Sequence, residues 1–357
     1  MLFFVFTTGK CNLNCKYCGG SFPQHLVPWD IGYNFEHLKE FIAQDAEPIV
    51  AFYGGEPLLN TNMIRTVMEN IPAKHFVIQT NGLLTKELEP RYWNRMSTVL
   101  LSIDGVQEVT DHYRGRGVYE RVIDSARHLR RIGFEGDLLA RMTVTELSDV
   151  YRDVTHLLSL GLFDHVHWQL NVVWSERWKN FDKWVAKSYN PGISRLISLW
   201  VSRIGQGEVL GIVPFLGLMK TMLFDEYMAP PCGAGRNAFA IATDGRIIAC
   251  PIAVDAKELE LGHLWTCKPE SLRNAIRIEE PCTSCEIFRY CGGRCLYAYK
   301  KRYWGDEGFR KICNVTKHLV NSLLEKKNEI ERQLERGIVS RKQLYYPPFN
   351  NTTEIIP

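Results

Sequence analysis

Three cysteines near the N-terminus have the spacing of a metal site. Cys11, Cys15 and Cys18 follow one another as C-x3-C-x2-C, directly after a short apolar segment. Three thiolates on one tight loop can bind three irons of a [4Fe–4S] cluster and leave the fourth iron open to a small molecule. An open iron favours catalysis, whereas a site closed by four cysteines favours electron transfer or structure.

Two simpler interpretations of these cysteines stay open. A zinc site normally takes four Cys or His ligands with C-x2-C pairs, and His25 is the nearest candidate for a fourth ligand, at an unusual spacing. The three thiols could also be inert. A spacing motif is a hypothesis that needs its structural context, so the elements around the cysteines must decide.

The remaining cysteines form a second group. Of the eleven cysteines, three lie at 11–18 and the rest at 232–313. This clustering fits metal sites better than a disulfide network. The second group has Cys232 and Cys250 first, then a C-x2-C-x5-C-x3-C run, then Cys313. The run consists of Cys282, Cys285, Cys291 and Cys295.

Bulk composition excludes several classes of protein. The formal net charge of +3 over 357 residues gives no strong attraction to nucleic acid or to a membrane surface. The apolar start lacks a basic leading region, so it is no signal peptide. No apolar run approaches the roughly 20 residues of a membrane span. Cysteine-rich metal sites without a secretion signal predict a reducing, anaerobic cytoplasm.

Short apolar segments alternate with helix-like segments through the first half of the chain. The apolar segments are rich in β-branched residues, as expected of parallel strands that are buried on both faces. A closed eight-unit barrel takes about 250 residues, so residues 1–171 predict an α/β fold with a partial (β/α)6 TIM-like barrel. The predicted strands are 2–7, 48–53, 75–80, 98–103, 138–144 and 165–171. The predicted helices are 35–44, 60–70, 85–94, 118–131 and 149–160.

Three further segments follow this predicted core. Residues 172–231 read as a helical connector, in which the tryptophans pack in the core or line a substrate-facing wall. Residues 232–313 carry the second cysteine group and are expected to form a small Cys-rich domain. Residues 314–357 contain a charged amphipathic helix at 314–336 and a loosely held tail from Tyr345. The connector's tryptophans are Trp174, Trp178, Trp184 and Trp200.

Polar and glycine-rich motifs follow the predicted strands, where parallel α/β folds place their chemistry. Gly54, Gly55, Glu56 and Pro57 follow the second strand. Two glycines let the backbone approach a ligand closely, and Glu56 can accept a hydrogen bond from a ligand ammonium. Asn81 follows the third strand, and Ser102 and Asp104 follow the fourth, although Asn-Gly and Asp-Gly are also ordinary turn formers.

The cysteine loop and these motifs together resemble the radical SAM superfamily. The resemblance implies that Cys11, Cys15 and Cys18 hold a cluster whose open iron binds S-adenosylmethionine (SAM), with Tyr17 against the adenine. It implies that the reduced cluster cleaves SAM to a 5′-deoxyadenosyl radical. Arg114 and Arg141 are candidates for the SAM carboxylate, because guanidinium binds carboxylate in a bidentate fork; structural salt bridges are the alternative. The remaining expected SAM contacts are Gly54, Gly55, Glu56, Pro57, Asn81, Ser102, Asp104 and Gln169.

The second cysteine group resembles the SPASM domain, which binds auxiliary [4Fe–4S] clusters. The resemblance implies three [4Fe–4S] clusters in all. An outer auxiliary cluster would take Cys282, Cys285, Cys291 and Cys313, and an inner one Cys232, Cys250 and Cys295. Cys267 is left over. It is either a bystander, which leaves an open iron at the inner cluster, or a fourth ligand. Zinc is again the simpler alternative.

The resemblance implies an enzyme that modifies a peptide or protein, as in the maturation of ribosomal peptides by a thioether or carbon–carbon crosslink. The runner-up is an oxidase of the anaerobic sulfatase-maturing type, which makes formylglycine. A non-catalytic iron–sulfur carrier is the third possibility. The expected partners are the peptide or protein substrate and an electron donor such as ferredoxin or flavodoxin, with no nucleic acid or membrane. The first strand begins at residue 2, so any leader peptide is expected to bind a separate protein or residues 172–231.

Overall fold

The computed structural model describes residues 1–172, 175, 178–347 and 349. The chain forms two compact units that do not follow the order of the sequence. Unit 1 comprises Met1–Ile103, Thr110–Leu139 and Gly233–Arg277. Unit 2 comprises Asp104–Val109, Ala140–Cys232 and Ile278–Pro357. The predicted Cys-rich segment 232–313 is therefore divided between the two units.

Parallel strands form the centre of unit 1. These are β1 (Leu2–Thr8), β2 (Ile49–Gly54), β3 (His75–Thr80) and β4 (Met96–Ser102), each paired in parallel with its neighbour along the chain. Every residue of β1 is buried, because the strand is covered on both faces. The first residues of β5 (Asp137–Val144) lie beside β4.

A later part of the chain extends this sheet on the other side of β1. The strand β7 (Ala238–Ile241) pairs in parallel with β1, from Leu2 opposite Ala238 onward. It continues into an antiparallel hairpin with β8 (Arg246–Ile248) and β9 (Glu260–His263). The sequence did not predict β7 or β8, whereas it predicted all of the strands before them.

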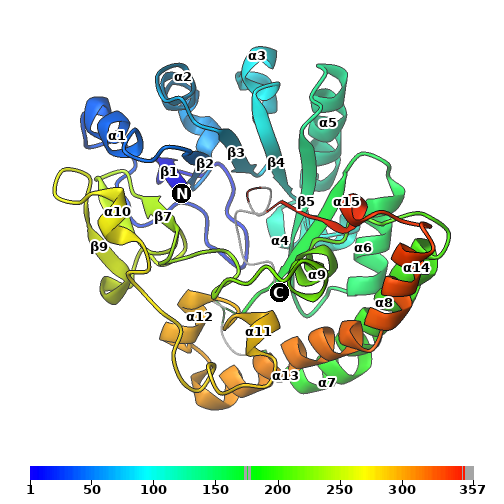
Figure 1. The fold of residues 1–357 in the computed structure, drawn as a ribbon. Helices are drawn as coiled ribbons and strands as arrows, with labels where there is room; N and C mark the ends of the chain where they lie inside the picture. The colour runs from blue at the N-terminus through cyan, green and yellow to red at the C-terminus, as the bar shows by residue number, and fades with distance from the viewer. Residues whose placement is uncertain (173–174, 176–177, 348, 350–357) are drawn as a thin grey trace. The chain divides into compact units, whose positions relative to one another are not determined.

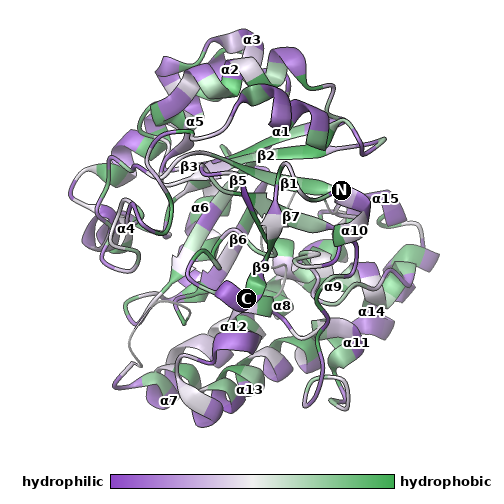
Figure 2. Cartoon of the chain, turned by 90° about the vertical axis from the view of Figure 1, so that its left-hand side faces the viewer, coloured by the Kyte–Doolittle hydropathy of each residue, from purple (hydrophilic) through white to green (hydrophobic). Residues whose placement is uncertain are grey.

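Amphipathic helices cover the sheet of unit 1. Figure 1 shows α1 (Phe35–Ile42), α2 (Thr61–Asn70), α3 (Pro90–Trp93) and α5 (Val118–Arg131) along one side of strands β1 to β4. Figure 2 shows the strands as mainly hydrophobic and the outer turns of these helices as hydrophilic. The short helices of unit 1 are η1 (Pro57–Asn60), η2 (Thr85–Glu87), η4 (Lys257–Leu259) and α10 (Pro269–Leu272).

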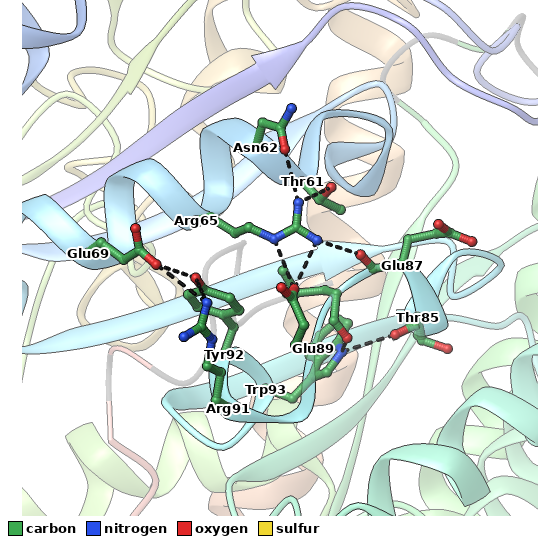
Figure 3. A network of polar contacts seen from close by, with 11 residues as sticks. Thr61, Asn62, Arg65, Glu69, Thr85, Glu87, Glu89, Arg91, Tyr92 and Trp93 are labelled. Carbon is green, nitrogen blue, oxygen red and sulfur yellow. Dashed lines mark hydrogen bonds and ion pairs between the residues drawn. The ribbon is translucent and has the colours of Figure 1, made fainter.

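A polar network joins α2 to the segment around α3, and Figure 3 shows its members. The Arg65 guanidinium donates hydrogen bonds to the Glu89 carboxylate at 2.9 Å and to the Glu87 carbonyl at 3.0 Å. The Tyr92 hydroxyl donates to the Glu69 carboxylate, and the Trp93 indole donates to the Thr85 carbonyl at 3.0 Å. These contacts fix a loop that has little regular structure of its own.

Unit 2 contains the end of β5, the strand β6 (His165–Leu170) beside it, and most of the helices. Helix α4 (Gln107–Arg114) begins in unit 2 and ends in unit 1. No helix of the described residues is long and apolar enough to span a membrane. The other helices of unit 2 are α6 (Val150–Ser159), α7 (Phe181–Trp184), η3 (Val185–Tyr189), α8 (Asn190–Ile204), α9 (Val213–Phe224), α11 (Phe288–Cys291), α12 (Leu296–Lys301), α13 (Gly305–Leu324), α14 (Lys327–Glu335) and α15 (Arg341–Leu344).

The tryptophans of the predicted connector pack in the core of unit 2. Trp178 and Trp184 are 9% and 8% exposed, with ring centroids 5.0 Å apart, and Trp304 packs 6.0 Å from Trp178. Trp200 is fully buried. The structure therefore favours core packing over a substrate-facing wall for these three connector residues, and Trp174 lies outside the described residues.

The structure confirms the predicted fold class: an α/β sheet of mainly parallel strands that forms an open barrel, with β6 and β9 as its edges. Two element predictions were wrong. The helix at 85–94 is two short helices, because Pro90 has no N–H to continue one. The helix predicted at 314–336 begins at Gly305 and breaks at 325–326. In the predicted tail, Tyr346 is fully buried against His165, and residues 348 and 350–357 lie outside the described residues.

Candidate active site

The cysteine loop follows β1 and is held by hydrogen bonds of its own backbone. The N–H groups of Cys18 and Gly19 both donate to the Cys15 carbonyl, at 3.1 and 2.9 Å. The Cys11 N–H donates to the Ser21 hydroxyl at 2.9 Å. Cys15 is buried, Cys11 is half-buried and Cys18 is exposed. The loop therefore has a rigid base and a thiol that faces outward.

The Cys11 thiol is half-buried and lies near Glu56 and Cys18. Burial raises the pKa of the Cys11 thiol, and the nearby Glu56 and Cys18 charges raise it further. The Leu13 N–H, 3.4 Å from the Cys11 sulfur, and the Asn81 amide act in the opposite direction. Metal binding requires thiolates, so iron must displace the proton from such a buried thiol. Grouped thiols with N–H donors nearby are the donor set that an iron–sulfur cluster needs.

The two glycines after β2 are required by the stem of the cysteine loop. A Cβ on Gly54 would lie 2.2 Å from the Thr8 carbonyl oxygen, and one on Gly55 would lie 2.2 Å from the Lys10 carbonyl oxygen. The N–H groups of Gly55 and Glu56 donate to these same two carbonyls, at 3.1 and 2.8 Å. The motif therefore packs directly on the residues that precede Cys11.

Glu56 is a buried carboxylate with three donors. Its side chain is the N-cap of η1 and accepts from the Leu58 N–H at 3.0 Å. It also accepts from the Thr80 hydroxyl and from the Asn81 N–H, each at 2.7 Å. Burial raises the pKa of Glu56 to about 7, although the three hydrogen bonds act to lower it. Its predicted contact with a SAM ammonium remains a prediction.

Asn81 lies at the end of β3 and reaches the cysteine loop. Its side-chain amide nitrogen donates to the side-chain oxygen (Oδ1) of Asn12 at 2.7 Å and lies 3.9 Å from the Cys11 sulfur. Ser102 ends β4 and is 8% exposed. The carboxyl ends of β1 to β4 are thus at one edge of the sheet, as the parallel arrangement predicts.

Tyr17 and Arg114 are side by side in unit 1. The guanidinium of Arg114 is 5.5 Å from the centre of the Tyr17 ring. The centres of the Tyr17 and Tyr113 rings are 5.8 Å apart. The Lys16 N–H donates to the Tyr113 carbonyl at 2.9 Å, which docks the end of α4 on the cysteine loop. The structure thus brings together two residues that the sequence separates widely.

Three of the other predicted SAM contacts belong to unit 2. Asp104 is fully buried and accepts from the Thr143 N–H at 2.8 Å. Arg141 on β5 donates to the Met142 carbonyl at 2.8 Å, and Gln169 on β6 lies 3.3 Å from His167. The Asp104 contact is a structural role that the motif alone did not predict. The expected SAM contacts of Asp104, Arg141 and Gln169 remain predictions.

The four thiols predicted for the outer cluster all lie in unit 2 and influence one another. Burial raises the pKa of Cys282 to about 11, with contributions from Cys313 and Cys285. Burial raises the pKa of Cys291 to about 12, with contributions from Cys313 and Cys282. No three Cys, His, Asp or Glu side chains within the described residues form a single-ion site. A [4Fe–4S] cluster takes one thiolate per iron, so its ligands are grouped without meeting at one point.

The thiols predicted for the inner cluster are divided between the units, with Cys250 in unit 1 and Cys232 and Cys295 in unit 2. Their shared cluster remains a prediction. Cys267 follows β9, and its sulfur is 3.6 Å from the Leu261 carbonyl oxygen. Whether Cys267 is a bystander or a fourth ligand remains a prediction.

Several residues of the site were not found from the sequence. Asn12 and Thr80 bond to predicted site residues, but Asn and Thr are common in loops and strands and gave no signal. Asp153 is fully buried beneath the loop after β4, where a Cβ on Gly105 would lie 2.4 Å from the Asp153 Cβ. The only sequence signal near Asp153 is Asp149, the N-cap of α6, and that signal predicts the start of a helix and not a site residue.

The chain is similar to two enzymes of known activity. The chain is 22% identical over 326 residues to a cysteine-type anaerobic sulfatase-maturating enzyme of Clostridium perfringens, covering 80% of this chain and 85% of that protein. It is 24% identical over 327 residues to mycofactocin maturase MftC of Mycobacterium tuberculosis, covering 82% and 77%.

Solved structures share the fold. Native anSMEcpe with bound AdoMet and Cp18Cys peptide has a TM-score of 0.71 at 20% identity and covers 92% of this chain and 99% of its own. Streptococcus suis SuiB bound to precursor peptide SuiA has a TM-score of 0.57 at 14% identity and covers 83% and 72%. Residues 5–153 match the Radical SAM superfamily. The part of the chain that carries the cysteine loop and strands β1 to β5 is therefore a radical SAM domain.

Proposed function

We propose that this chain is a radical SAM/SPASM enzyme that modifies a peptide or protein, as in the maturation of a ribosomally made precursor. One observation carries the proposal: the cysteine loop, the Gly54–Glu56 turn and Asn81 meet at the carboxyl edge of the sheet in unit 1. Among proteins of similar fold, anSMEcpe and SuiB were solved with peptides bound. The product would be a thioether or carbon–carbon crosslink.

The residues of the site have separate roles in this proposal. Cys11, Cys15 and Cys18 would hold the SAM-cleaving [4Fe–4S] cluster. When bound there, the cluster and SAM supply a 5′-deoxyadenosyl radical that removes hydrogen from unactivated carbon. Tyr17 would lie against the adenine, and Arg114, beside it, would bind the SAM carboxylate. Gly54 and Gly55 pack on the stem of the cysteine loop, and the turn that they form with Glu56 and Pro57 would contact the methionine moiety.

We infer two auxiliary clusters in addition. Burial and neighbouring thiols of the same set raise the pKa of Cys282, Cys291 and Cys313, and this grouping supports an outer cluster with four thiolates. Cys232, Cys250 and Cys295 would hold the inner one, with an iron open to a substrate atom. An electron donor such as ferredoxin or flavodoxin would reduce the clusters. Cysteine clusters that bind metal are typical of reducing compartments, so we place the enzyme in a reducing cytoplasm.

A formylglycine-forming oxidase of the sulfatase-maturing type is the second candidate. The likeness to the Clostridium perfringens enzyme, at 85% coverage of that protein, favours it as much as the leading proposal. The two candidates differ in product. A crosslink and an aldehyde each remove two hydrogens from the substrate, but only the aldehyde reacts with hydrazine.

The test is mass spectrometry of candidate peptides incubated with the anaerobically reconstituted enzyme, SAM and a reductant. The peptides are a short Cys-rich precursor encoded beside the enzyme and a sulfatase-derived peptide with Cys at its modified position. A product lighter by two hydrogens that is inert to hydrazine supports crosslinking, and a hydrazine-reactive one supports the oxidase. Cys15→Ala should abolish both reactions. A wild-type enzyme that transfers electrons but does not cleave SAM would instead indicate a non-catalytic iron–sulfur electron carrier.

A further inference from the structure

We propose that Glu56, Thr80 and Asn81 are positioning residues that hold the cysteine loop from the ends of β2 and β3. The inference deepens the proposed function and rests on it, because it assumes that Cys11, Cys15 and Cys18 bind a cluster. It gives Glu56 and Asn81 a role in the chain itself, distinct from the contact with SAM that their motifs predict.

The Asn81 side chain connects the end of β3 to the cysteine loop. Its amide nitrogen donates to the side-chain oxygen (Oδ1) of Asn12 at 2.7 Å and lies 3.9 Å from the Cys11 sulfur. Its amide oxygen accepts from the Leu83 N–H at 3.0 Å. Both ends of the amide are therefore engaged, so rotation of the group would break a contact at each end. At 8% exposure, Asn81 has little water to replace these bonds.

Glu56 and Thr80 in turn fix the backbone that carries Asn81. One Glu56 carboxylate oxygen accepts from the Asn81 N–H, and the other accepts from the Thr80 hydroxyl. The Thr80 hydroxyl oxygen also accepts from the Gly82 N–H at 3.1 Å. Glu56 is 1% exposed, and a carboxylate buried to this degree is costly unless donors satisfy it. The three residues form a connected unit in which each polar group has a partner.

This unit holds the cysteine loop on both sides of Cys11. On one side, the Glu56 N–H donates to the carbonyl of Lys10, the residue before Cys11. On the other side, Asn81 binds the side chain of Asn12, the residue after Cys11. Two anchors that flank a ligand limit its rotation, as outer partners of metal ligands do. Hydrogen bonds toward a cysteine sulfur also raise the reduction potential of a cluster.

A positioning role for Glu56, Thr80 and Asn81 predicts other defects than a direct contact with SAM does. Loss of an outer partner typically lowers metal affinity 10- to 100-fold, and loss of a donor near sulfur makes the reduction potential more negative. Loss of a SAM contact raises the KM for SAM and leaves the cluster unchanged. Thr80 gives the cleanest separation. Its hydroxyl is bonded to Glu56, and Thr80→Val removes that bond while it keeps the shape of the side chain.

The experiment compares Thr80→Val, Thr80→Ser and Asn81→Ala in the anaerobically reconstituted full-length enzyme. The cluster at Cys11, Cys15 and Cys18 is identified as the one whose electron paramagnetic resonance signal changes when SAM is added. We measure its midpoint potential, the rate of iron loss to a chelator, and the KM for SAM. Thr80→Val and Asn81→Ala should lose this cluster roughly 10-fold faster, at a more negative potential, and Thr80→Ser should match the wild type.

Two outcomes would overturn the inference. In the first, Asn81→Ala keeps the wild-type potential and rate of iron loss while its KM for SAM rises. In the second, Thr80→Ser is as defective as Thr80→Val. The signals of the auxiliary clusters and the thermal unfolding midpoint report misfolding separately. If Cys15→Ala retains the full iron content and the SAM-dependent signal, the proposed function itself fails. The positioning role of Glu56, Thr80 and Asn81 then fails with it.

Discussion

At the scale of single residues, the absence of a side chain is as important to this site as any functional group. Gly55 has a negative φ, so only the lack of a Cβ explains its place. A Cβ there would meet the carbonyl oxygen and carbon of Lys10 at 2.2 and 2.5 Å, which are backbone atoms that cannot rotate away. The Gly-Gly-Glu turn is thus specified by close packing on the cysteine loop.

We expect Gly55→Ala to push the cysteine loop away from β2. Overpacking of this kind costs about 1–3 kcal/mol of unfolding free energy, and the displaced loop should bind less iron. Gly205→Ala is the matched control, because a Cβ there would be 3.4 Å from its nearest neighbour. Iron analysis and thermal unfolding of both variants test the argument, which fails if Gly55→Ala keeps the wild-type iron content.

Asp153 gives a prediction for pH. Burial raises the pKa of its carboxyl to about 6, above the ordinary value of 3.8, although the Arg152 charge acts to lower it. A raised carboxyl pKa means that the folded chain holds the proton more tightly. The stabilisation is therefore complete below about pH 4 and is lost as the pH rises through 6.

We expect the wild type to lose about 1 kcal/mol of unfolding free energy from this residue between pH 5 and 7. Asp153→Asn removes the titration. The unfolding free energy of the wild type, measured relative to that of the variant, should therefore fall by that amount between pH 5 and 7. Urea unfolding of the holoenzyme at several pH values measures it. Asp124→Asn, at an exposed position on α5, should leave the wild-type slope intact. A parallel pH profile for Asp153→Asn would refute the assignment.

At the scale of elements, the β7–β8 hairpin supports the segment that follows the cysteine loop. The hydroxyl of Thr243, in the hairpin turn, donates to the Pro28 carbonyl at 2.6 Å. The Gly32 N–H donates to the Thr243 carbonyl at 2.8 Å, and Arg246 donates to the Leu26 carbonyl. Residues 26–32 have no helix or strand of their own, so the hairpin determines their path.

Thr243→Val keeps the shape of this fully buried residue and removes its donor. We expect a loss of about 1 kcal/mol, the net value of one hydrogen bond, and faster amide hydrogen exchange confined to residues 22–32. Thr66→Val is the control, since the Thr66 hydroxyl bonds within the exposed face of α2. Equal exchange in both variants would show that the hairpin does not hold the segment.

The elements also show what the sequence could predict. Buried parallel strands such as β1 and β3 are continuous apolar runs, so their positions followed from composition alone. The prediction of one helix at 85–94 was wrong, although the spacing of its polar residues is typical of a helix. Pro90 and the contact of Arg65 with the Glu87 carbonyl instead fix two short helices. The site behaved likewise. Cysteine spacing predicted the loop, whereas Asn12 and Thr80 act through neighbours that are distant in sequence.

At the scale of the whole molecule, chain order and three-dimensional order differ. Residues 233–277 join the N-terminal sheet through β7, whose pairing with β1 links Leu2 to Ala238. No local pattern encodes such a pairing, because the strand–strand contact depends on both partners. The sequence therefore predicted a separate Cys-rich segment, whereas half of that segment belongs to unit 1.

Iron content tests the assignment of all cysteines together. Three [4Fe–4S] clusters predict about twelve irons per chain, and loss of one cluster leaves about eight. Cys313→Ser and Cys285→Ser should each give about eight, and they differ in location, since Cys313 lies within α13 and Cys285 does not. Agreement between these two variants therefore separates loss of a ligand from damage to a helix.

Cys15→Ala should also leave about eight irons, but it alone should abolish SAM cleavage. Cys267→Ser should keep the wild-type iron content, because the Cys267 thiol donates to the Leu261 carbonyl of the hairpin. Iron and sulfide analysis of the reconstituted variants, with 5′-deoxyadenosine as the product assayed, decides each case. A loss of iron in Cys267→Ser would mean that the hairpin rearranges when a cluster binds, and the open iron proposed for the inner site would then be closed.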